Sequence, residues 1–155
     1  MRTLALLIAV AVSACTTPTR APSQAQSSAP DVAGCLAAAQ PETRRACIGV
    51  ASRRCMEAPG GDTTAGMVQC AQAETRQWEL IRHRQIAGLR ARESETQIAM
   101  LDAALTEHAR WALANCSYEA SRYEGGTLAH VVAATCMRDQ TAELTLSLLA
   151  RDDEG

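Results

Sequence analysis

The chain has 155 residues, of which 47% are hydrophobic, yet two tryptophans and two tyrosines are its only aromatic residues. A core built from small aliphatic side chains gives so short a chain little hydrophobic stabilisation, and covalent cross-links therefore become important. Arginine supplies all the basic residues, 15 against 17 acidic ones, and the net charge of −2 excludes the basic surface typical of nucleic-acid-binding proteins.

The first 14 residues are predicted to be a secretory signal peptide, because the basic Arg2 precedes an apolar run that ends in Val-Ser-Ala at 12–14. This run is too short for a stable membrane-spanning helix. The cysteine that follows makes the junction resemble a bacterial lipobox, in which Cys15 is acylated and anchors the exported protein. Thr16, rather than Asp, favours the outer membrane, with the protein facing the periplasm. The alternative is ordinary cleavage, which leaves a soluble protein with a free Cys15.

Residues 15–31 contain three of the five prolines among Ser, Thr, Ala and Gln, and they predict a disordered tether after the lipidated cysteine. The remainder, 32–155, is long enough for one domain with one core. Its six cysteines, an even number, favour disulfides in an exported chain. We expect no metal or other cofactor, because no CxxC pair occurs and the histidines are scattered at His83, His108 and His130.

Two short helices are expected first. One covers 31–39 with Asp31 as its cap, and the second covers 41–57 with Pro41 in its first turn. The second helix should stop before the turn Pro59-Gly60-Gly61.

A third helix, capped by side-chain oxygens of residues 62–64, should run to about Arg92. Ser94 and Gln97 have the spacing of a capping box, which places a turn before a fourth helix. The alternative, one unbroken helix as far as Tyr123, would be roughly 90 Å long and could not bury its apolar stripe in so small a domain.

The fourth helix should end near Tyr123, and the fifth should begin at Thr127, after the Gly125-Gly126 turn, and fray over 152–154. The apolar face of the fourth helix is made of Ile98, Leu101, Leu105, His108, Ala112 and Cys116. That of the fifth helix is made of Leu128, Val131, Val132, Thr135, Leu144 and Leu148. No segment shows strand-like alternation, so the predicted fold is all-α, a small disulfide-stapled bundle of four to five antiparallel helices.

These helical hairpins also predict how the cysteines pair. Cys116 and Cys136 lie about 10 Å and 13 Å from the turn between them, along antiparallel arms, so they should be level with each other. The same reasoning gives two further pairs, Cys35 with Cys47 and Cys55 with Cys70. Sequential pairing is therefore favoured among the fifteen possible connectivities.

No catalytic signature such as GxSxG, HExxH or a glycine-rich phosphate loop is present, and we do not expect an enzyme. His108 lies on an apolar helix face, where a buried, hydrogen-bonded histidine is favoured over a functional site. The best candidates for contacting a partner protein are Tyr118, Glu119, Tyr123 and Glu124. Tyrosines offer large contact area at low entropic cost, and the acids suit a basic partner. The alternative is that one tyrosine packs beneath the loop while both glutamates are solvated.

The cysteine frame and the YEGG turn carry a family resemblance. CMEAPGGDTTAGMVQC, CSYEASRYEGGTLAHVVAATC and TAEL are similar to the LprI-type lysozyme inhibitor N-terminal domain family, which comprises secreted or lipid-anchored bacterial helical domains. The resemblance covers about residues 55–149. The family pattern falls on Met67, Cys70, Cys116, Glu119, Tyr123, Gly125, Gly126, Cys136 and Thr141. It implies a protein that binds and inhibits lysozyme, with c-type lysozyme as the candidate partner.

The sequence departs from this pattern at six positions. The usual Leu-Asn-x-x-Tyr falls on Arg82, His83 and Ile86, a tryptophan falls on His108, and two arginines fall on Ala112 and Leu144. These departures favour the alternative of a non-catalytic envelope adaptor or structural lipoprotein. A hydrolase acting on the cell wall is a third and weaker class.

Overall fold

The computed structural model describes residues 31–153, so the predicted signal peptide, Cys15 and nearly all of the tether lie outside the described residues. Its helices are α1 (Val32–Ala38), the 3-10 helix η1 (Pro41–Cys47), α2 (Val50–Met56), α3 (Thr64–Arg92), α4 (Glu95–Ser121) and α5 (Leu128–Asp153). No strand occurs among the described residues, and the all-α prediction is confirmed.

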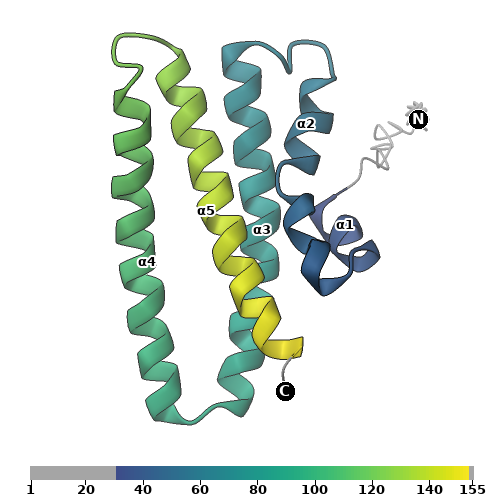
Figure 1. Ribbon diagram of the computed structural model, residues 1–155, viewed down its shortest axis with the longest axis vertical. Coiled ribbons are helices and arrows are strands. Elements are labelled where there is room, and N and C mark those ends of the chain that lie inside the picture. Colours follow the sequence, from purple (N-terminus) through teal and green to yellow (C-terminus); the bar gives the residue numbers. More distant parts are fainter. Residues whose placement is uncertain (1–30, 154–155) are drawn as a thin grey trace, which may run out of the picture.

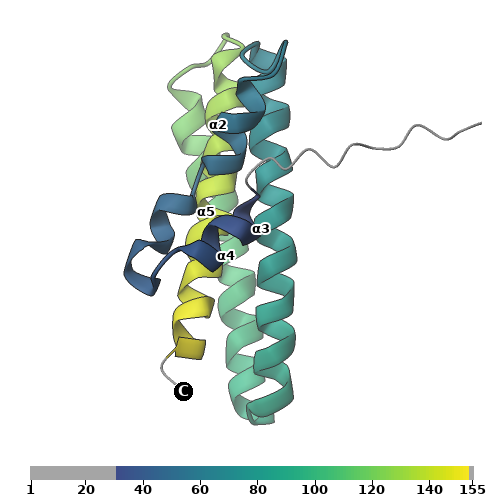
Figure 2. The same cartoon turned by 90° about the vertical axis from the view of Figure 1, so that its right-hand side faces the viewer.

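The three long helices form the body of the molecule. Consecutive ones are antiparallel, which makes α3 and α5 parallel, and Figure 1 shows α5 lying between α3 and α4. The segment from α1 to α2 covers one side of α3 and α5, as the view in Figure 2 shows. Helix α5 packs extensively against both α3 and α4. Helices α3 and α4 make few direct contacts, so α5 holds them together.

The predicted helix starts agree with the structure. Asp31 and Thr63 accept backbone N–H bonds from the first turns of α1 and α3, and Ser94 forms a full capping box with Gln97 at the start of α4. At its other end α5 continues to Asp153, and residue 154 of the segment predicted to fray lies outside the described residues.

One predicted helix is wrong. The segment 41–57 is not continuous but breaks into η1 and α2 at Gly49, whose φ of +83° is left-handed. Glycine adopts this conformation without the steric penalty of a Cβ atom. The break exposes backbone N–H groups at the start of α2, and a side chain of α3 satisfies them from outside the helix.

That side chain is Glu74, which is completely buried. Its Oε1 accepts the backbone N–H of Gly49 at 2.6 Å and the indole N–H of Trp78 at 3.1 Å, while Oε2 accepts the backbone N–H of Ser52 at 2.6 Å. The Ser52 hydroxyl in turn donates to the carbonyl of Cys70 at 3.2 Å. Buried polar groups remain stable only when they are paired in this way, and Glu74 therefore docks α2 onto α3.

The apolar core has two parts. One part surrounds the fully buried Trp78 and includes Val32, Cys47 and Ala142. It brings α1, η1, α3 and α5 together. The other part consists of Leu89, Leu101 and Leu148, one residue from each long helix. Of the apolar faces predicted for α4 and α5, Leu128 is the exception, because it begins α5 beside the turn and is 46% exposed.

Three disulfides staple the bundle, and they join the sequential pairs that hairpin geometry predicts. Cys35–Cys47 links α1 to η1, Cys55–Cys70 links α2 to α3, and Cys116–Cys136 links α4 to α5. Their Cα–Cα distances are 5.7, 5.5 and 5.4 Å, in the usual range for a disulfide.

Two helical glycines of α3 should respond oppositely to alanine. A Cβ atom at Gly66 would overlap the carbonyl oxygen of Gly60, whereas at Gly88 the nearest atom is the end of the Arg92 side chain at 3.9 Å. We expect Gly66→Ala to lower the free energy of unfolding by about 2 kcal/mol. Gly88→Ala should raise it by about 0.5–1 kcal/mol, because glycine is a poor helix former. Urea denaturation followed by circular dichroism measures both, and equal effects would contradict the close approach at Gly66.

Candidate functional site

The four predicted contact residues lie at one end of the bundle, and we call them the tyrosine edge: Tyr118, Glu119, Tyr123 and Glu124. The first two belong to the last turn of α4 and the others to the turn that leads into α5. Both tyrosines are exposed, Tyr118 by 61% and Tyr123 by 43%. The alternative in which one tyrosine packs beneath the loop is therefore wrong.

Local hydrogen bonds hold this turn in place. The N–H of Tyr123 donates to the carbonyl of Ala120, and the N–H of Gly126 donates to the carbonyl of Tyr123, both within 3.1 Å. Gly125 has a φ of +80°, a left-handed conformation that lets the chain reverse toward α5. The Cys116–Cys136 disulfide joins the two helices about two turns away. The edge is therefore constrained both locally and covalently.

Sequence reasoning missed the contribution of Arg122. Its guanidinium lies over the Tyr118 ring, 5.4 Å from the centroid, and 3.8 Å from the carboxyl group of Glu119. The hydrogen bond to Tyr118 and the charge of Glu119 raise the pKa of Arg122. The tyrosine edge thus carries one cation beside two acids, and Arg122 holds the ring of Tyr118 in place. Spacings of three and four residues on a helix are the signal that indicates these contacts.

The exposed face of α4 also extends the edge. Met100, Trp111 and Tyr118 are 69%, 55% and 61% exposed, and their separations of 11 and 7 residues place them on one side of the helix. We call this set the α4 stripe. The helical spacing was visible in the sequence, but only the structure shows that these side chains are not core residues. Exposed aromatic residues are typical of protein-binding surfaces.

A cavity of about 310 Å³ lies halfway along the bundle, where α3, α4 and α5 converge. All six positions that depart from the family pattern line it, namely Arg82, His83, Ile86, His108, Ala112 and Leu144. These residues are up to 62 positions apart in the sequence, from Arg82 to Leu144, which is why no sequence motif indicates their proximity. The departures are therefore concentrated in one place and leave the tyrosine edge intact.

His108 is not the buried, hydrogen-bonded histidine that its position in the helix suggested. It is half-buried, it lies at the cavity, and no hydrogen bond to it occurs among the described residues. Burial and the nearby charge of Arg82 lower its pKa. Its ring centroid lies 6.1 Å from that of Trp111, which joins the cavity to the α4 stripe.

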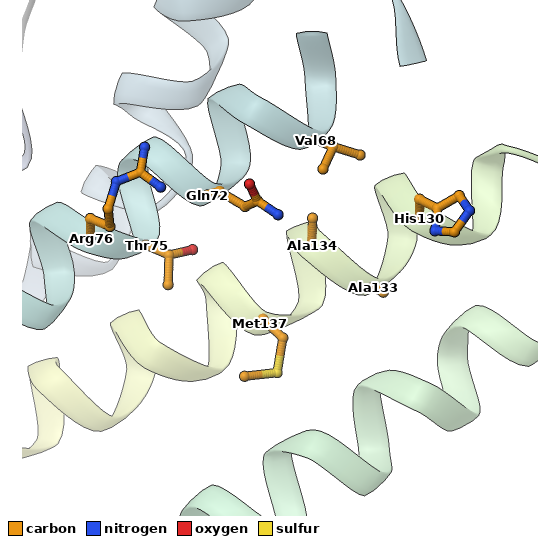
Figure 3. Close-up of a pocket in the computed structure, with 8 residues that line it drawn as sticks. All are labelled: Val68, Gln72, Thr75, Arg76, His130, Ala133, Ala134 and Met137. Atoms are coloured by element: carbon orange, nitrogen blue, oxygen red, sulfur yellow. The ribbon is translucent and has the colours of Figure 1, made fainter. Parts of the chain in front are cut away.

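An open groove of about 450 Å³ lies between α3 and α5. It continues from the cavity toward the end of the bundle where α3 and α5 begin. Figure 3 shows Gln72 and Thr75 of α3 facing α5, with Arg76 directed away from it. Met137 of α5 lines both the groove and the cavity, so the two spaces adjoin. Arg76 and His130 of the groove are both exposed, whereas the side chain of Arg82 at the cavity is only 23% exposed.

Comparison with known proteins gives one match. The family model described as Lysozyme inhibitor LprI matches residues 55–148, from the end of α2 to near the end of α5. No curated protein and no solved structure shows significant similarity to the chain. Within residues 31–153, no group of three or more His, Cys, Asp or Glu side chains is placed to hold a metal ion.

Proposed function

We propose that this chain, which belongs to the LprI family of lysozyme inhibitors, binds c-type lysozyme through the tyrosine edge and thereby inhibits it. The family match carries this proposal, and the edge supplies a surface with suitable chemistry. Glycoside hydrolysis by lysozyme depends on two carboxyl groups that flank the scissile bond. A rigid, acidic, tyrosine-bearing turn that fills the cleft would block access to them.

The rigidity of the turn supports this assignment. A binding loop that is already ordered loses little conformational entropy on association, so more of the contact energy remains as affinity. At the tyrosine edge the backbone bonds of the turn, the cation–π contact at Tyr118 and the nearby disulfide all provide such order. The acids favour encounter with a cationic lysozyme, while the tyrosines supply contact area.

An assay of peptidoglycan lysis tests the proposal. A peptidoglycan suspension is exposed to c-type lysozyme with and without excess purified protein, at low and physiological salt. We expect the protein to slow lysis at tens of micromolar. If it gives no protection, the envelope adaptor takes the place of the inhibitor as the assigned function, and turnover of peptidoglycan by the protein alone would indicate a hydrolase instead.

Charge at the tyrosine edge should control association. Glu119→Gln with Glu124→Gln leaves Arg122 as the nearest charge, so the approach of a basic lysozyme becomes less favourable. We expect association to slow roughly 3- to 10-fold at low salt, and the difference to shrink at physiological salt. Glu95→Gln with Glu107→Gln removes the same charge from α4 outside the edge and serves as the matched control. Equal slowing by both pairs would assign the effect to net charge.

Tyr123 should control release. Tyr123→Ala removes an exposed ring from the centre of the turn, and a central aromatic contact commonly contributes more than 1 kcal/mol to binding. We expect dissociation to become about tenfold faster with association little changed. Surface plasmon resonance with immobilised lysozyme separates the two rates. A dissociation rate equal to that of the unaltered protein would remove Tyr123 from the interface.

Location in the cell envelope is a further part of the proposal. Three disulfides are typical of a protein in an oxidising compartment, which agrees with export. In residues 31–153 there is no helix whose length and apolar character would let it span a membrane. We propose that the acylated Cys15 attaches the protein to the outer membrane, through the tether over residues 16–31.

Acylation of Cys15 predicts a specific change in mass. Mass spectrometry of the native protein should find Cys15 as the first residue, carrying a diacylglycerol group and an acylated amine. A serine at position 15 cannot carry these acyl chains, on which stable anchoring depends. Cys15→Ser should therefore release the protein from the membrane fraction. An unmodified Cys15 amine on native protein would contradict the lipobox and support ordinary cleavage.

A further inference from the structure

We propose that the cavity between α3, α4 and α5 binds a small carboxylic acid with a short aliphatic body. The three helices contribute two kinds of lining. Arg82, His83 and His108 provide cationic or hydrogen-bonding groups, whereas Ile86, Leu105 and Leu144 provide apolar surface. A ligand with an anionic head and an aliphatic body matches both kinds at once. This site is separate from the tyrosine edge, and the inference does not depend on lysozyme inhibition.

Arg82 is the anchor for the anionic head. Its side chain is only 23% exposed, and its ion pair with Glu79 has an N–O distance of 4.0 Å, the outer limit for such a contact. Within the described part of the chain no closer acceptor approaches it. A guanidinium presents five donors in a planar fork that matches a carboxylate. A bound carboxylate would therefore compensate a partly desolvated charge that Glu79 compensates poorly.

His108 provides a second polar contact. Among the lining residues, the charged or titratable groups that share the cavity with it are Glu79, Arg82 and His83 of α3, while α5 contributes only uncharged side chains. Burial and the charge of Arg82 lower the pKa of His108, which favours the neutral ring, and a neutral imidazole can donate one hydrogen bond. An anion next to Arg82 would offset the positive charge, so binding should raise the pKa of His108.

The size of the cavity sets the size of the ligand. At about 310 Å³ it is at the lower end of the range for small-molecule sites, about 300–1,000 Å³. Ala109 and Ala112 of α4 leave this space because their side chains are short. Ala109 is exposed at the rim, whereas Ala112 is buried. A larger residue at Ala109 would thus narrow the opening without disturbing the packing of the helices.

Isothermal titration calorimetry tests the inference on the mature protein, without the predicted signal peptide, and uses 4-methylpentanoate as the probe. We expect saturable binding with one site per chain, and at least tenfold weaker binding of 4-methylpentanamide, which lacks the charge, and of inorganic phosphate, which lacks the aliphatic body. Arg82→Gln and Ala109→Leu should each weaken binding at least tenfold. Arg84→Gln is the matched control, since this exposed arginine lies on α3 beside α1 and should leave binding unchanged.

A second readout separates a ligand site from general charge attraction. Proton NMR of the histidine rings, recorded as a function of pH, should show an increased pKa for His108 in the presence of saturating 4-methylpentanoate, whereas the acid should leave the ring signals of the exposed His130 in place. Thermal unfolding checks that the variants are folded. The inference is overturned if no probe binds at 10 mM, if phosphate binds as well as the acid, or if Arg84→Gln weakens binding as much as Arg82→Gln.

Discussion

Replacing Glu74 with alanine is expected to lower the free energy of unfolding by about 4 kcal/mol. The variant leaves three buried donors without an acceptor, namely the backbone N–H groups of Gly49 and Ser52 and the indole N–H of Trp78. A buried donor that loses its partner costs about 1–3 kcal/mol. The loss is large beside the 5–15 kcal/mol that stabilises a typical domain, and it acts where α2 packs on α3 beside Trp78.

Two further variants make this measurement specific. Glu74→Gln keeps one oxygen acceptor but places an amide N–H₂ group among donors, so it should cost about half as much. Glu107→Ala removes an exposed acid whose partner is Arg110 on the surface of α4, and it should change stability by less than about 0.5 kcal/mol. Urea denaturation with intact disulfides measures all three. A loss below 1 kcal/mol for Glu74→Ala would show that water replaces its hydrogen bonds.

Glu74 also shows where prediction from the sequence fails. The helix starts at Asp31, Thr63 and Ser94 were predictable because capping is decided within four residues. The break at Gly49 was not, because the acceptor that stabilises it lies 25 residues away on another helix. No side chain near Gly49 caps α2, so the local sequence predicts one continuous helix. The break becomes understandable only from the packing of α3 against this segment.

The same distinction applies to the candidate sites. The tyrosine edge could be located because its members fall within seven residues around one glycine turn. The α4 stripe had a visible period, but helical spacing alone cannot distinguish an exposed face from a buried one. The cavity depends on how three helices cross, which no local pattern specifies. Its six unusual residues were conspicuous singly, yet only the bundle brings Arg82 next to His108.

Removing the Cys116–Cys136 disulfide is expected to lower stability by about 3 kcal/mol and to weaken the proposed inhibition of lysozyme. The two cysteines are 20 residues apart, and opening a loop of this size restores about that much chain entropy to the unfolded state. The double variant Cys116→Ser with Cys136→Ser also loosens the joint between α4 and α5 beside the tyrosine edge. The edge must then become ordered on binding, which reduces affinity.

The Cys55–Cys70 disulfide provides the matched control for this effect. It closes a loop of 15 residues between α2 and α3, so its removal should cost a similar amount of stability. It does not join the helices that carry the tyrosine edge, and Cys55→Ser with Cys70→Ser should leave inhibition unchanged wherever the variant is folded. Chemical denaturation and the lysis assay, performed at a temperature where both variants are folded, separate the two effects. Equal loss of inhibition in both variants would mean that global stability matters, whereas selective loss in the first would show that inhibition needs the rigid hairpin between α4 and α5.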